Sequence, residues 1–592
     1  MPDYFSKTIP DNPRNRNMVR DIRQAAAKYR ETEIFELPFS KYRIYFETGS
    51  RVEYEACYID HRRRLNVYTV MALSSGDPLW IRGLEDILWA VCNEFTWAFP
   101  AHIKDERDLP ESSVTIDLFA AETGLAVSEA CHLAGDRLSP LVRDRVKKEV
   151  ERRILTPYRE RELKFHKDNW SAVCAGCVAM AAMYWEGYEG YLSIEEKVTA
   201  SMEDFLGSYQ EDGCCLEGIL YWGYGFGYFC YFAHMLRWFS GGKRDWFRRE
   251  KVKQIALFRQ RVSLEKDVAV PFADAPHNYG CHIGLAHFLA KEYEEAHVPE
   301  ESCAAWFDQD IRHRFADLIR DLYWYDPELE RSRKEEELVI FEKSQWYLAK
   351  RPGYAFAAKA GRNNEPHNHN DVGHFVLYAG GRFILDDLGW PEYDKDYFGE
   401  KRYENLCASS FGHSVPVLGG AGQERGGSHR GCFLKAGENY LRMDISGAYP
   451  EGLCARLIRE FKLSERSVCL SDRIEGTPFP VRERFVTRIR PVIEKGEEGD
   501  AVIIGDWRVR PVGVSCLAAL EEHRFCPRLS ICKTDMKPVE TVWCVDFVIP
   551  EPCPEISFVI ENISPAASVS TPPADRETVP GYTGGETSPP SS

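Results

Sequence analysis

The chain has 592 residues, and its 75 lysines and arginines against 92 aspartates and glutamates give a net charge of −17. This acidic balance disfavours a general affinity for nucleic acid or for an anionic membrane surface. An apolar share of 44% and an aromatic share of 13% exclude a fully disordered chain and are typical of a globular protein with large cores.

The first twenty residues lack the apolar segment and the small-residue cleavage site of a secretory signal. No run of about 18 uncharged apolar residues occurs, so no membrane-spanning helix is predicted. Without an export route, the 19 cysteines are expected to be reduced and mostly buried. We therefore predict a cytoplasmic protein of several domains.

Helical periodicity dominates the first part of the chain, from about residue 58 to residue 335. Leu84, Ile87, Leu88, Val91 and Phe95 follow the spacing of one buried helix face. Further helices are expected at about 113–134, 139–154, 171–186, 194–207, 225–240, 251–263, 278–295 and 302–325. Many helices with short polar connections predict a bundle, a solenoid or a toroid, and periodicity alone does not choose among these.

The pattern changes after the charged stretch 331–337. Segments 375–378 and 383–385 flank Gly380-Gly381 and predict a β-hairpin with a glycine turn. Alternating segments continue to about residue 561, so we predict an antiparallel β-sandwich at 336–562 after a helical domain at 1–335. Residues 563–592 are rich in serine, threonine, proline and glycine and are predicted to form a disordered tail.

The densest polar cluster is the segment 363–371, Asn-Asn-Glu-Pro-His-Asn-His-Asn-Asp. In an extended conformation, His367, His369 and Asp371 would share one face. Two imidazoles and a carboxylate supply most of a zinc site, although a polar loop without metal is an equally common alternative. The predicted hairpin returns Asp387 toward this cluster, and His413 follows in a third segment. Together these residues favour a structural zinc site.

Two candidate sites lie in the helical part. Residues 217–225, Glu-Gly-Ile-Leu-Tyr-Trp-Gly-Tyr-Gly, place Tyr221 and Tyr224 among glycines just before a predicted helix. Aromatic residues usually belong to a core, but closely spaced glycines tend to expose neighbouring rings, and a tyrosine hydroxyl in a groove can act as an acid or a base. Asn169 or Ser171 precedes another helix, where capping is the simpler explanation.

These segments, in this order, resemble the heparinase II/III-like polysaccharide lyase family. The matching segments are 169–174, 217–225, 364–373, 387–389 and 412–414, and a further match at 96–102 extends the likeness over roughly residues 55–430. The family fold is an (α/α) toroid followed by an antiparallel β-sandwich. The resemblance therefore implies a multidomain α+β chain with this organisation.

Lyases of this kind cleave a glycosidic bond next to a uronic acid by β-elimination. The resemblance implies that this chain acts on a uronic-acid-containing oligosaccharide or polysaccharide. Asn169 would neutralise the uronate carboxylate, and Tyr221 would be the base, the acid or both, with Tyr224 as runner-up. His367 would assist proton removal or carboxylate binding.

The resemblance also implies a structural Zn²⁺ held by His369, Asp387 and His413. The hairpin is one residue longer than usual in the family, which makes Asp386 a rival to Asp387 and His374 a candidate additional ligand. Further substrate contacts are expected from Glu217, Trp222, Asn364 and Glu365.

Two other functions remain open from the sequence. A glycoside hydrolase on a similar helical toroid would use paired carboxylates such as Asp212 and Glu217. A non-catalytic carbohydrate-binding protein would keep the fold and bind without turnover. No nucleic-acid or membrane partner is expected, and the sequence indicates neither the oligomeric state nor the particular glycan.

Overall fold

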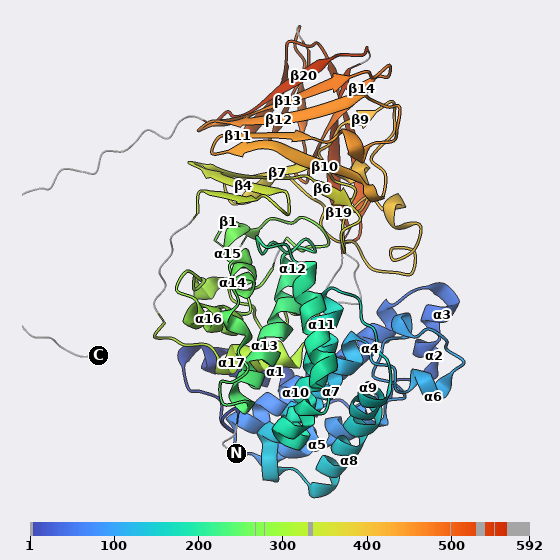
Figure 1. Cartoon of the computed structure of the whole chain (residues 1–592), viewed down its shortest axis with the longest axis vertical. Coiled ribbons are helices and arrows are strands. Elements are labelled where there is room, and N and C mark those ends of the chain that lie inside the picture. The colour runs from blue at the N-terminus through green and yellow to red at the C-terminus, as the bar shows by residue number, and fades with distance from the viewer. Residues whose placement is uncertain are drawn as a thin grey trace, which may run out of the picture.

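The computed structural model describes residues 4–266, 268–277, 279–329, 336–497, 499–527, 539–549 and 551–564. Helices occupy the N-terminal part of the chain and antiparallel strands the C-terminal part (Figure 1). The predicted α+β order is thereby confirmed. The predicted tail lies outside the described residues from residue 565 onward. None of the described helices combines the length and apolar content needed to cross a membrane.

The helical part runs from α1 to α17. Its α-helices are α1 (Pro13–Arg30), α2 (Phe39–Tyr42), α3 (Ile44–Thr48), α4 (Val52–Ser74), α5 (Pro78–Asn93), α6 (Leu109–Ser112), α7 (Leu118–Ala134), α8 (Pro140–Val150), α9 (Thr156–Glu160), α10 (Asn169–Leu192), α11 (Glu195–Ser208), α12 (Ile219–Tyr221), α13 (Gly227–Phe239), α14 (Glu250–Ala256), α15 (Phe258–Arg261), α16 (Ile283–Glu292) and α17 (Phe315–Tyr323). Helix α5 ends before Phe95, which is 45% exposed and does not belong to the buried face predicted for it.

Helix α10 is the central helix of this part, packing against α7, α11 and α13. Its sequence is rich in alanine, glycine and cysteine, and its first half is buried all round, as expected for a helix without a polar face. Asp168, rather than Asn169 or Ser171, caps the helix, because its carboxylate accepts the Trp170 amide at 3.0 Å. The Asn169 side chain is consequently free for another role.

The strands form four sheets in which every paired strand is antiparallel to its neighbour. The strands are β1 (Ser263–Glu265), β2 (Val268–Ala269), β3 (Leu338–Phe341), β4 (Trp346–Arg351), β5 (Tyr354–Lys359), β6 (Gly361–Asn363), β7 (Phe375–Ala379), β8 (Arg382–Leu385), β9 (Val417–Leu418), β10 (Gly426–Gly437), β11 (Tyr440–Asp444), β12 (Arg456–Leu463), β13 (Ser467–Glu475), β14 (Val481–Thr487), β15 (Val492–Glu494), β16 (Ala501–Ile504), β17 (Trp507–Val512), β18 (Leu517–Phe525), β19 (Glu540–Ile549) and β20 (Glu555–Asn562).

The sheets differ in size and strand order. A two-stranded sheet pairs β1 with β2 inside the helical part, and the five-stranded sheet has the order β3-β4-β5-β7-β8. The nine-stranded sheet has the order β15-β16-β17-β20-β13-β12-β11-β10-β6, and the four-stranded sheet the order β18-β19-β14-β9. The predicted hairpin is β7–β8, with Tyr378 opposite Phe383 across the glycine turn.

The helical part and the five-stranded sheet share one hydrophobic core. Trp346 of β4 contacts Phe258 of α15 and Phe272, with ring centroids 6.1 and 5.1 Å away. Apolar burial of this kind is the main stabilising contribution to such an interface. The shared core holds the loop between β6 and β7 against the helical part, where the polar cluster of the sequence meets α12.

Candidate active site and metal centre

A cavity of 1410 Å³ lies between the helical part and the strands, and side chains of both parts line it. Tyr221, from α12, and His367, from the β6–β7 loop, are among them. Their rings stack with centroids 3.9 Å apart and an interplanar angle of 20°. The structure thus brings a phenol of the helical part and an imidazole of the strand part together at one cavity.

Asn169 and Glu217 form a buried pair beside this stack. The Asn169 Nδ2 atom donates to Glu217 Oε2 at 2.6 Å, and His367 Nε2 lies 3.9 Å from the same oxygen. Burial raises the pKa of Glu217 to about 7, so its carboxyl group changes charge near neutral pH. The Asn169 Oδ1 atom is buried without a hydrogen-bond partner among the described residues.

The glycine-rich segment 217–225 allows its backbone to lie close to Asn169. Residues Trp222–Phe226 form a π-helical turn, a feature that occurs frequently at functional sites. A Cβ atom at Gly225 would lie 3.0 Å from the Asn169 Cβ, closer than nearly all real contacts. Glycine at this position therefore lets the α12–α13 segment pack directly on the start of α10.

His367 adopts a left-handed backbone conformation, with φ of 56°. Such a value is strained for a residue with a side chain and concentrates at functional sites. The segment 364–371 is accordingly not an extended strand. His369 and Asp371 turn toward a buried group of potential metal ligands, whereas His367 points to the cavity, so the three do not share one face as the sequence predicted.

Asp274 is a functional candidate that sequence reasoning missed. Its side chain is fully buried, and its oxygens lie 2.9 Å from His367 Nδ1 and 3.0 Å from His369 Nε2. It also accepts hydrogen bonds from Tyr393, Tyr397 and Arg402 at 2.8, 2.5 and 3.2 Å. The only signal in the sequence is a lone carboxylate in the apolar run Pro-Phe-Ala-Asp-Ala-Pro, 271–276.

Asp274 is held in its ionised form. Burial alone would raise its pKa, but the Arg402 charge and the hydrogen bonds from His367 and His369 hold the pKa of Asp274 well below its usual range. Each of the groups around it must therefore present a hydrogen, because an ionised carboxylate only accepts.

Tyr221 is connected to this carboxylate through a second tyrosine. Its hydroxyl lies 3.0 Å from that of Tyr393, which donates to Asp274. Tyr393 has one hydroxyl hydrogen, so Tyr221 is the donor in the tyrosine pair. Burial and the negative charge of Asp274 raise the pKa of Tyr221 above its ordinary range. Tyr221 is therefore protonated in the resting site.

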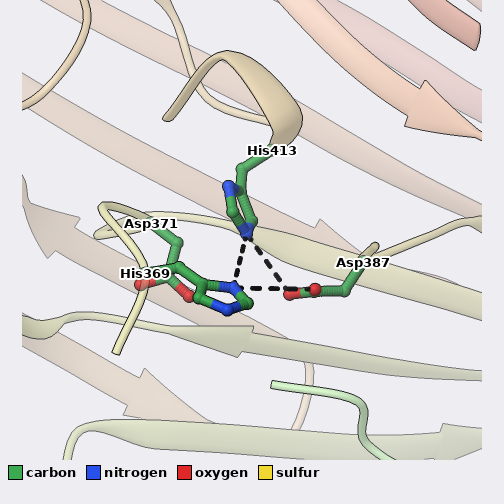
Figure 2. A group of neighbouring side chains, drawn as sticks. All are labelled: His369, Asp371, Asp387 and His413. Carbon is green, nitrogen blue, oxygen red and sulfur yellow. Dashed lines mark hydrogen bonds and ion pairs between the residues drawn. The ribbon is translucent and has the colours of Figure 1, made fainter. Parts of the chain in front are cut away.

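A second group of polar side chains lies behind His367. Figure 2 shows His369, Asp387 and His413 turned toward one another, with Asp371 beside them. His369 Nδ1 lies 3.2 Å from His413 Nε2, and Asp387 lies 4.0 and 3.6 Å from these two nitrogens. All four residues are buried, and one ligand atom from each lies within 4.8 Å of the others.

The outer hydrogen bonds of His369 and His413 leave each ring with a nitrogen lone pair that faces the other ring. His413 Nδ1 lies 2.8 Å from the Ser409 carbonyl, and His369 Nε2 faces Asp274, so both outer nitrogens carry the hydrogen. Burial lowers the pKa of His413 to about 4, which keeps this ring neutral. Asp387 Oδ2 is buried and accepts no hydrogen bond of regular geometry in the described chain, although His374 Nε2 lies 3.3 Å away. Inward lone pairs and a buried carboxylate oxygen beside them fit a bound cation.

The structure distinguishes Asp387 from Asp386. The Asp386 carboxylate accepts hydrogen bonds from His277, at 2.8 Å, and from Arg488. It therefore joins the helical part to the residue that follows β14 and does not belong to the group of potential metal ligands. Asp387 is the residue that belongs to the group of potential ligands.

His374 and Asp371 are held by other partners. His374 Nδ1 accepts the Ser414 amide at 2.9 Å, so its Nε2 carries the hydrogen and faces Asp387 Oδ2 at 3.3 Å. His374 thus orients the aspartate and offers no lone pair. Both Asp371 oxygens bind the Lys359 ammonium, at 2.6 and 2.8 Å, so this member of the group, which the predicted ligand set omits, is already neutralised.

The remaining predicted residues lie at the margin of the site. Tyr224 lines the cavity under Arg314, but its buried hydroxyl has no hydrogen-bond partner among the described residues. Trp222 is buried and donates its indole N–H to the Ile255 carbonyl at 2.7 Å. Asn364 is exposed and Glu365 partly buried. The described residues that line the cavity do not include Glu217, Trp222, Asn364 or Glu365.

The helical part and the antiparallel sheets make up a fold similar to that of solved polysaccharide lyases. Heparan sulfate lyase HepC from Pedobacter heparinus matches over 95% of this chain and 84% of its own, with a TM-score of 0.58 and 12% identity. The heparinase III BT4657 gene product matches over 95% and 85%, with a TM-score of 0.59 and 13% identity.

Chondroitin AC lyase from Streptomyces coelicolor A3, in complex with chondroitin sulphate, matches over 89% of this chain and 79% of its own, with a TM-score of 0.56 and 11% identity. No protein-family model and no curated protein matches the sequence. The likeness to heparinase-type lyases predicted from the motifs is confirmed at the level of the fold.

Proposed function

We propose that this chain is a lyase that cleaves uronic-acid-containing glycans by β-elimination. The observation that carries the proposal is the stack of Tyr221 on His367 inside a large cavity, next to the Asn169–Glu217 pair. We also assign the helical part to an (α/α) toroid and the strands beyond residue 336 to a β-sandwich, as the resemblance implies.

The chemistry needs three functions at one place. The C5 proton of a uronate lies beside a carboxylate whose charge opposes formation of the enolate-like intermediate. The site must neutralise that carboxylate, remove the proton and protonate the leaving oxygen. Two of these functions require a proton acceptor and a proton donor on adjacent groups, which is how His367 and Tyr221 are arranged.

His367 is the base in this proposal, and Tyr221 is the acid. The Nδ1 hydrogen of His367 is held by Asp274, so Nε2 carries the lone pair that takes the C5 proton. The C5–H electrons form the C4–C5 double bond as the C4–O bond breaks. The leaving oxygen then takes the Tyr221 hydroxyl proton. Tyr224 is less suited to this step, because its hydroxyl is buried and has no hydrogen-bond partner among the described residues.

Asn169 neutralises the uronate carboxylate through its amide hydrogens. The Asn169 amide faces Glu217 with Nδ2 when Glu217 is ionised. A protonated Glu217 donates to Oδ1 instead, which turns Nδ2 toward the cavity. The two ends of an amide exchange by rotation, and their assignment follows from the hydrogen-bond network. With a pKa of about 7, Glu217 would populate both arrangements near neutrality.

His369, Asp387 and His413 hold a structural Zn²⁺ in this proposal. Their ligand atoms lie 3.2, 3.6 and 4.0 Å from one another, a spacing at which one Zn²⁺ would be held by all three side chains. The ion supplies a fixed crosslink between three segments. His369 is two residues from His367, so this crosslink orients the loop that carries the base.

The cavity favours a weakly charged glycan. Among the described residues, six arginines line it, and all six are ion-paired with carboxylates: Arg51, Arg63, Arg64, Arg312, Arg314 and Arg488. A sulfate that bound to one of these arginines would have to compete with the carboxylate already paired to it. Trp306, which is 60% exposed, and Trp170 instead offer aromatic faces on which sugar rings can stack. We therefore infer that the substrate is an unsulfated uronic-acid oligosaccharide or polysaccharide.

A screen of uronic-acid oligosaccharides with absorbance detection tests this function. A lyase produces a C4–C5 double bond that absorbs in the ultraviolet, without consuming water. New reducing ends without absorbance would instead indicate a glycoside hydrolase, and binding without turnover a carbohydrate-binding protein. The hydrolase is disfavoured because Asp212 accepts three hydrogen bonds from Lys343 and Ser344 in the β3–β4 turn and does not face the cavity.

A further inference from the structure

We propose that Asp274 is a positioning residue whose single carboxylate sets the hydrogen positions of both the base His367 and the metal ligand His369. The inference rests on the lyase function proposed above, because that function gives His367 its role. Asp274 lies in the segment between β2 and α16, and both histidines lie in the β6–β7 loop. The carboxylate therefore joins the helical part to two sites of the strand part.

The geometry assigns one oxygen of Asp274 to each imidazole. Oδ2 lies 2.9 Å from His367 Nδ1, and Oδ1 lies 3.0 Å from His369 Nε2. The two rings thus use opposite nitrogens toward the same carboxylate. Because the carboxylate only accepts, the single hydrogen of each neutral ring lies on the nitrogen that faces Asp274. This leaves His367 with a bare Nε2 at the cavity and His369 with a bare Nδ1 toward His413 and Asp387. If His367 carried its hydrogen on Nε2 instead, the site would lose its base. If His369 carried its hydrogen on Nδ1 instead, the metal site would lose a ligand.

Three further donors hold the carboxylate in place. Tyr397 donates to Oδ1, while Tyr393 and Arg402 donate to Oδ2. The Tyr221 hydroxyl donates to Tyr393, which in turn donates to the same carboxylate. Asp274 thereby sets the position of the acid as well as that of the base.

The backbone is strained at both ends of the Asp274–His367 contact. Ala273, directly before Asp274, has φ of 64°, and His367 has φ of 56°. Left-handed conformations in residues with a side chain persist only where the surroundings enforce them, and they cluster at functional sites. One such residue is a partner in this contact and the other directly precedes the second partner, so the surrounding structure enforces the backbone on both sides of it.

The variant Asp274→Asn tests the proposal. Asparagine is close to aspartate in size but offers one acceptor and one donor, so it cannot receive a hydrogen from both imidazoles. We expect zinc affinity to fall by about 10- to 100-fold or kcat by about 10³-fold or more, with KM changed by less than about threefold. The matched control is Asp386→Asn, a buried carboxylate that binds His277 and Arg488 but neither of the two imidazoles.

Histidine ¹⁵N NMR of the zinc-loaded wild-type protein provides a measurement that does not depend on the variant folding. We expect His367 to carry its hydrogen on Nδ1 and His369 on Nε2, with signals assigned by their loss in His367→Gln and His369→Gln. Chelator competition measures zinc affinity in the wild type and both Asp→Asn variants.

The proposal is overturned if His367 carries its hydrogen on Nε2 in the wild type. It is also overturned if Asp274→Asn keeps both zinc affinity and kcat, or if Asp386→Asn loses them equally. A wild-type protein that turns over no uronic-acid glycan refutes the lyase function alone. The NMR and zinc measurements still decide the role of Asp274 in that case.

Discussion

Replacement of Glu217 by glutamine should change how stability depends on pH. Glu217 is 6% exposed, and burial raises its pKa from 4.5 to about 7. Glutamine keeps the size of the side chain and can still accept the Asn169 hydrogen bond, but it does not titrate. The difference between the wild type and Glu217→Gln therefore isolates the free energy of ionising this one carboxyl group.

The sign follows from proton binding. Between pH 4.5 and 7 the folded protein keeps the Glu217 proton that the unfolded chain has lost. The contribution of Glu217 to stability is thus fully present below about pH 4.5 and is lost as the pH rises through about 7. A shift of 4.5 to about 7 corresponds to about 3 kcal/mol. The free energy of unfolding of Glu217→Gln, relative to that of the wild type, should therefore rise by up to this amount as the pH increases.

The assay is chemical and thermal unfolding of both proteins at pH values from 5 to 8.5. We expect the difference between the two curves to be smallest at pH 5, to grow up to about pH 7 and to level off above it, with the glutamine variant the more stable. Glu400→Gln serves as the control, because the Glu400 side chain is 94% exposed and its replacement should leave the pH profile unchanged. Parallel curves for the wild type and Glu217→Gln would refute the reasoning, because Glu217 would then ionise alike in both states.

Three further predictions concern activity and metal. Tyr221→Phe should lower turnover by at least about 100-fold, the usual scale for loss of a general acid, and near-wild-type turnover would transfer this role to Tyr224. His413→Ala should remove stoichiometric zinc together with thermal stability, as elemental analysis and melting curves would record; a metal-free and fully stable wild type contradicts this. An unsulfated uronate oligosaccharide should give a kcat/KM at least about tenfold above that of a sulfated one of equal length, since each lining arginine is already paired. A preference for the sulfated chain would refute the inference from paired arginines.

Periodic patterns carried much of the fold prediction. The β7–β8 hairpin followed from two apolar runs around Gly380-Gly381, and α7, α10 and α11 overlap the helices expected at about 113–134, 171–186 and 194–207. Helical periodicity did not predict where an element ends. Phe95 continues the periodicity of α5 in the sequence, but the helix ends at Asn93 and the ring turns to solvent.

Long-range contacts explain what sequence reasoning did not find. Asp274 receives hydrogens from residues 93 to 128 positions away, and no local spacing encodes such a meeting. Asp386 and Asp387 are adjacent and chemically identical. Only the partners of Asp386, His277 and Arg488, separate their roles, and both come from distant segments.

The division of the site between the two parts of the chain has a consequence for biosynthesis. A chain made from its N-terminus exposes Asp274 to water before any of its imidazole partners has been synthesised. The carboxylate is shielded from water only when the strands, which are synthesised later, pack against the helices. Domains generally fold in that order during translation. The buried site around Asp274 should therefore form only after residues 367–402, which supply its partners, have been synthesised.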